Sequence, residues 1–112
     1  MSLLVKALSC HEADEVEGAL DYARLALQMY ESGDKQRGRM FAEMAGQEYN
    51  HAQEIHELLV KEIEAAREKA DRLGIRPPEA MTRKYEEEHG RYVSAAALAK
   101  SYLDVCERLA SA

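Results

Sequence analysis

Two short interruptions divide this chain of 112 residues into three long segments. At the first, Gly33 suits the left-handed conformation that ends many helices, and Asp34 can cap the helix that follows. At the second, Gly74 can end a helix, and Pro77-Pro78 permit only an extended link or a first helical turn. The pattern predicts an all-α fold in one domain covering residues 1–112, with three long helices at about residues 3–31, 35–73 and 78–110.

Composition agrees with long helices and restricts the partners. Hydrophobic residues make up 46% of the chain and charged residues 32%, while Lys plus Arg at 15 against Asp plus Glu at 21 gives a net charge of −6. Without a basic stretch to follow a phosphate backbone, the chain is not expected to bind nucleic acid. Its apolar runs are short, and its first residues lack the features of a secretion signal, so we expect no membrane span and a cytoplasmic protein.

The two cysteines are too far apart in sequence for a paired metal-binding motif. Cys10 and Cys106 are therefore interpreted as buried free thiols, with a disulfide between them as the less favoured alternative.

Spacings of three and four residues predict which helix faces are buried. The first helix has the series Leu4, Leu8, His11, Glu15, Ala19, Tyr22, Ala26 and Met29. The second has the series Phe41, Met44, Glu48, His51, Ile55 and Leu59. A buried carboxylate is costly unless it is paired or coordinated, so Glu15 and Glu48 each require a partner.

An antiparallel hairpin brings these polar residues to one level. Glu15 lies about 17 residues before the first turn, and Glu48 and His51 lie about 15 and 18 residues after it, so all three are roughly 25 Å from the turn. One Glu from one helix and a Glu-x-x-His from the next form half of the carboxylate-bridged two-metal site of four-helix bundles. A second chain would complete the site. The ligand set favours iron, with manganese or zinc as alternatives.

Histidines outside this group are assigned less directly. Glu86 and His89 form a second Glu-x-x-His, but in a simple hairpin His89 would lie roughly 16 Å from the level of His51. His89 is kept as a candidate metal ligand. Three alternatives are open: the third helix reaches the site of another protomer, the link between the second and third helices is not a simple reversal, or His89 has another purpose. His11 is expected to be a core histidine, and His56 is expected to be exposed.

The quoted segments resemble a known superfamily. DEVEGALDYARLAL and EMAGQEYNHAQEIHELL resemble the first half of ferritin-like and rubrerythrin-like proteins. PPEAMTRKYEEEHGRYVSAAALAKSYL is similar to the third helix of small ferritin-like proteins often encoded in phage and prophage genomes. The resemblance implies a ferritin-like hairpin that completes a four-helix bundle by dimerisation. It also implies that the metal ligands are Glu15, Glu48, His51 and His89. The fourth helix of a full ferritin-like bundle is missing here.

Two functions of different classes follow. The first is a ferritin-like, metal-binding homodimer or larger homo-oligomer whose Glu/His, carboxylate-bridged di-iron centre oxidises iron(II), which is ferroxidase chemistry. The alternative is a non-catalytic helical interaction or structural protein that retains the scaffold. No Lys or Arg occupies either helix seam at the level of Glu15 and Glu48, which favours the metal.

Overall fold

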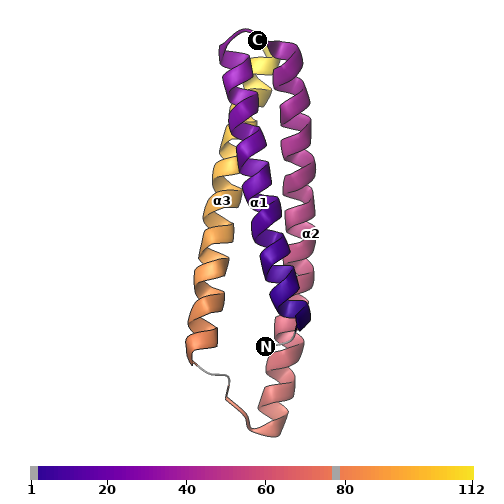
Figure 1. Ribbon diagram of the computed structural model, residues 1–112, viewed down its shortest axis with the longest axis vertical. Helices are drawn as coiled ribbons and strands as arrows, with labels where there is room; N and C mark the ends of the chain where they lie inside the picture. Colours follow the sequence, from indigo (N-terminus) through magenta and orange to yellow (C-terminus); the bar gives the residue numbers. More distant parts are fainter. Residues whose placement is uncertain (1–2, 77–78) are drawn as a thin grey trace.

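The computed structural model describes residues 3–76 and 79–112, which form three helices and, within those ranges, no strand. The helices are α1 (Leu3–Glu31), α2 (Lys35–Leu73) and α3 (Glu79–Ser111). In Figure 1, α1 and α3 run in the same direction and α2 runs antiparallel to both. The all-α prediction is confirmed, as are the first two helices; the predicted start of the third helix at residue 78 lies outside the described residues.

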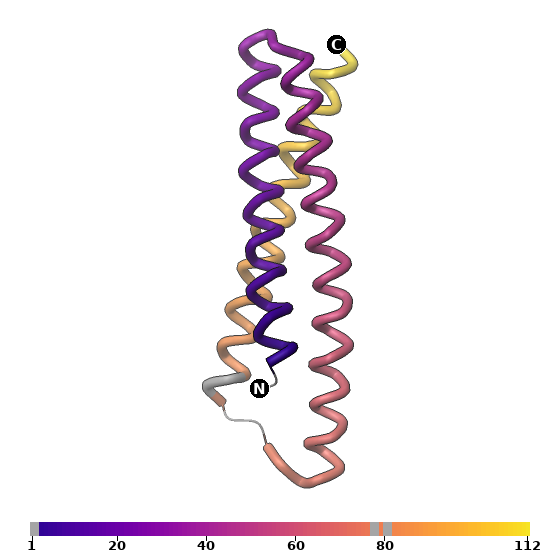
Figure 2. The backbone as a smooth tube through the Cα atoms, turned by 45° about the vertical axis from the view of Figure 1, so that its right-hand side comes forward, coloured from indigo at the N-terminus to yellow at the C-terminus, as the bar shows by residue number. Residues whose placement is uncertain are grey.

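The two turns have the conformations that the sequence predicts. Gly33 has a φ of 87° and Gly74 a φ of 66°, both in the left-handed region that glycine adopts without strain. Asp34 caps α2, because its Oδ1 accepts a hydrogen bond from the backbone N–H of Arg37 at 3.0 Å. Figure 2 shows that the resulting α1–α2 hairpin is uneven, since α2 continues well past the beginning of α1.

Small residues allow the helices to pack closely. Ala19, Ala23, Ala26, Ala45 and Ala99 have no exposed surface. At Gly38 an added Cβ would lie 2.8 Å from the ring of Tyr30, so the absence of a side chain there permits close contact across the hairpin. The result is a rod of 60 × 19 × 18 Å.

The buried stripe of α1 differs from the predicted one. The buried residues are Val5, Ser9, Glu12, Val16, Ala19, Ala23 and Ala26. Leu4 and His11, which were predicted to be buried, are exposed. The reason is that α1 packs against both α2 and α3, so its most buried row points between two neighbours rather than at one. Ala19 and Ala26 of the predicted stripe are fully buried, whereas Leu4 and His11 near its N-terminal end lie at the open side of the hairpin.

One of the two thiol predictions is wrong. Both cysteines are free, but Cys106 is buried whereas Cys10 is exposed.

Among the described residues, no helical segment has the length and apolar character needed to traverse a bilayer.

Candidate metal centre

Three of the predicted ligands come together halfway along the α1–α2 hairpin. One donor atom each from Glu15, Glu48 and His51 lies within 4.8 Å of the other two. Nδ1 of His51 is 3.9 Å from Oε2 of Glu15. The equal heights calculated for an antiparallel hairpin thus predicted this group correctly. The Glu15 side chain is 19% exposed and that of His51 is 58% exposed, so the group has a buried base and an open rim. His51 is therefore more exposed than its place in an apolar stripe predicted.

One carboxylate oxygen of Glu15 has no hydrogen-bond partner among the described residues. Its Oε2 atom is buried and accepts no hydrogen bond from any described residue. The pKa of Glu48 is raised, first because its carboxyl forms a hydrogen bond with Glu15, then because of burial and of the negative charge of Glu15. The ion pairs that Glu15 forms within the described residues are with histidines, His11 and His51. The two carboxyl groups therefore share a proton or attract a cation.

Gly18 makes the space that the Glu48 carboxyl occupies. A Cβ added at Gly18 would lie 3.0 Å from Oε2 of Glu48, closer than ordinary van der Waals contact. The carboxyl of α2 thus lies against the bare backbone of α1, one turn from Glu15. This role of Gly18 was not predicted, although glycine inside a long helix is a signal of close approach.

His11 lies beside the same group. Its Nε2 is 3.5 Å from Oε1 of Glu15, and its side chain is 64% exposed. The expectation of a core histidine is wrong, because this N-terminal part of the predicted α1 stripe lies at the open side of the hairpin.

His89 lies apart from the Glu15, Glu48 and His51 group, against His56. Its ring stacks on that of His56 with centroids 5.3 Å apart, and it is not part of the converging group of Glu15, Glu48 and His51. His89 is therefore level with His56, which lies closer to the C-terminal end of α2 than His51 does. Glu86 is exposed, as expected for a solvated charge.

A second polar cluster, which the sequence analysis missed, links all three helices. Glu12 of α1 is 3% exposed, and its Oε2 lies 2.7 Å from Nδ1 of His56 on α2. His56 in turn stacks on Tyr92 of α3 with centroids 4.3 Å apart. Ser9 donates a hydrogen bond to Glu88 of α3 nearby. His56 was expected to be exposed; instead its side chain is only 22% exposed.

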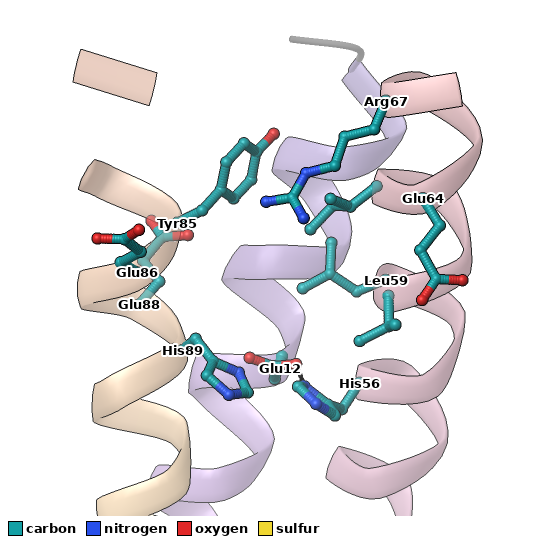
Figure 3. A pocket seen from close by; sticks show the side chains of 11 residues that line it. Glu12, His56, Leu59, Glu64, Arg67, Tyr85, Glu86, Glu88 and His89 are labelled. Atoms are coloured by element: carbon teal, nitrogen blue, oxygen red, sulfur yellow. Dashed lines mark hydrogen bonds and ion pairs between the residues drawn. The ribbon is translucent and has the colours of Figure 1, made fainter. Parts of the chain in front are cut away.

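Burial and the contact with His56 have opposite effects on the pKa of Glu12. Burial raises the pKa of Glu12, and the hydrogen bond and positive charge of His56 lower it in part. The cluster borders a cavity of about 250 Å³ between α2 and α3, with Leu59 and Tyr85 among its walls (Figure 3). Its donor atoms do not converge as those of Glu15, Glu48 and His51 do, so we assign the Glu12–His56 pair a structural role.

Comparison of the chain with protein-family models, with curated proteins and with solved structures found no match. The functional argument therefore depends on the site.

Proposed function

We propose that this protein is a ferritin-like metal-binding protein that holds iron through Glu15, Glu48 and His51. The observation that carries the proposal is the meeting of two carboxylates and an imidazole around a buried oxygen of Glu15 that has no hydrogen-bond partner among the described residues. The pKa of Glu48 is raised first by its hydrogen bond with Glu15, then by burial and by the negative charge of Glu15, and a cation would offset that charge. The space at Gly18 supports the same function, because it admits the second carboxyl to the site.

The donors determine the class of metal. Carboxylate oxygens with one imidazole suit iron(II) or manganese(II), and zinc can also occupy such a set. Two iron ions bridged by carboxylates would supply the chemistry for oxidising iron(II) with oxygen. In the protein, the partly buried Glu15 and Glu48 bind and orient the metal, and the more exposed His51 closes the open side.

A second copy of the chain is the proposed source of the remaining ligands. Exposed apolar side chains lie on the same helix faces as the site, as the spacings of three and four residues show: Leu4, Leu25, Met40 and Leu58. Exposed apolar surface around a half-complete polar centre favours self-association. Two hairpins facing each other would bring four Glu and two His to one centre.

The first test is metal content. Untagged protein is loaded with iron(II) without oxygen, separated by size-exclusion chromatography with light scattering, and analysed for metal per chain. We expect about one iron per chain for the wild type.

Glu15→Ala and His51→Ala should lose the metal while circular dichroism shows intact helices, and full occupancy in both variants would contradict the proposal. A stable oligomer that takes up no metal would favour the non-catalytic interaction protein. Oxygen consumption on addition of iron(II) then tests oxidation.

A glycine substitution tests the site without removing a ligand. Gly18→Ala should displace the Glu48 carboxyl and weaken iron binding, because the new Cβ would lie 3.0 Å from its Oε2. Gly46→Ala is the matched control, since a Cβ there meets no atom within 4 Å. Competition with a coloured iron(II) chelator measures both affinities. Equal affinities in the two variants would show that the position of Glu48 does not matter for the metal.

A further inference from the structure

We infer that His11 is a fourth ligand of the centre, so that each chain supplies two imidazoles and two carboxylates. This inference rests on the proposed metal site and extends it. It changes the ligand set from one imidazole per metal to two, and both imidazoles, His11 and His51, belong to a single hairpin.

The first observation is the position of His11 on α1. His11 and Glu15 are four residues apart and therefore share one helix face. Nε2 of His11 lies 3.5 Å from Oε1 of Glu15, the oxygen next to the unpartnered Oε2. On α2, Glu48 and His51 are three residues apart and likewise share a face. Each helix of the hairpin thus carries one carboxylate and one imidazole at this level. His11 contacts Glu15 and lies outside the group of donors that converge within 4.8 Å, so its ring must turn to reach a metal held there.

The directions of the helices place both imidazoles on one side of the carboxylates. His11 is displaced from Glu15 by about 6 Å along α1, toward the N-terminal end. His51 is displaced from Glu48 by about 4.5 Å along α2, which runs the opposite way, so the displacement in space has the same sense.

The exposure of His11 allows it to coordinate. With 64% of its side chain exposed, the ring can turn toward a metal without disturbing packed neighbours. Histidine is also a common metal ligand in its neutral form. A weaker role is open to the same residue, since a hydrogen bond from His11 could merely orient Glu15 as a positioning residue.

The relative affinity for different metal ions distinguishes a ligand set with two imidazoles from a set with one. Imidazole suits zinc, cobalt, iron and nickel, whereas oxygen-rich sites suit manganese and magnesium. A ligand role therefore predicts that His11→Gln weakens cobalt(II) binding more than manganese(II) binding. A role in orienting Glu15 predicts equal losses for the two ions.

The probes are cobalt(II) and manganese(II), each added separately to the full chain. Cobalt(II) and manganese(II) affinities are measured for the wild type, His11→Gln and Glu48→Gln. His89→Gln is the matched control, because His89 is also exposed but lies against His56. Proton NMR of the cobalt protein then counts exchangeable imidazole N–H signals shifted by the paramagnetic ion, one for each coordinating histidine.

We expect two such signals in the wild type and in His89→Gln, and one in His11→Gln. Cobalt(II) affinity should fall by about tenfold or more in His11→Gln, since even residues that only support a ligand cost about that much. One signal in the wild type would overturn the inference, whatever the affinities. Unchanged affinity and signals in His11→Gln would overturn it too, while loss of binding in Glu48→Gln would leave the proposed function standing. A wild type that binds neither ion would overturn both.

Discussion

At the scale of single residues, the raised pKa of Glu48 makes the stability of the folded chain depend on pH. Its folded-state pKa lies above the ordinary value of 4.5, first because of its hydrogen bond with Glu15. The ionised carboxylate is therefore less favourable in the folded chain than in the unfolded one. The corresponding stability of the metal-free protein is fully present below pH 4.5 and is lost as the pH rises through the folded-state pKa.

Glu48→Gln should remove this pH dependence. We expect the metal-free variant to be more stable than the wild type near neutral pH, because the neutral amide can donate a hydrogen bond to Glu15. The gain should be less than about 1 kcal/mol, since solvent reaches the group. Thermal unfolding across about pH 4 to 7 measures this gain, because the range begins near the ordinary carboxyl pKa and extends to neutral pH. Adding iron(II) should stabilise only the wild type, and a less stable metal-free variant at neutral pH would contradict this account.

At the scale of helices, the Glu12–His56 pair holds the hairpin to α3. His56→Ala would leave the buried Glu12 carboxylate without its partner and remove the ring that stacks on Tyr92. We expect the free energy of unfolding to fall by about 1–3 kcal/mol. His51→Ala is the control in metal-free protein, because its side chain is 58% exposed, and it should change stability by no more than about 0.5 kcal/mol. Urea unfolding compares the two, and equal losses would refute the structural assignment.

The helices and the three-residue centre could be predicted because both depend on local signals. Gly33, Asp34 and Gly74 set the helix ends, and counting residues from one turn placed Glu15 level with the Glu48–His51 pair. Which side of α1 is buried could not be predicted, because it depends on where α3 packs. A single stripe was assumed for α1 and for α2, although each packs against two helices. This is why the environments of His11 on α1 and His56 on α2 were predicted wrongly.

At the scale of the whole molecule, the exposed apolar face of the hairpin predicts self-association. Leu25→Glu should shift the protein toward monomer, because Leu25 is 38% exposed on the same face as the centre. Val93→Glu is the matched control on α3, where the wild-type side chain is 49% exposed. Light scattering over a range of concentrations measures the mass. A monomer produced by Val93→Glu but not by Leu25→Glu would place the contact on α3 instead.

The rod shape of the chain affects how such masses must be measured. Its radius of gyration is 17.5 Å, whereas a compact domain of this length has about 13 Å. An elongated monomer diffuses slowly and leaves a gel-filtration column early, at the volume of a heavier spherical protein. Elution volume alone would thus report a dimer where none exists, and a true side-by-side dimer, thicker but no longer, would tumble more nearly as a sphere.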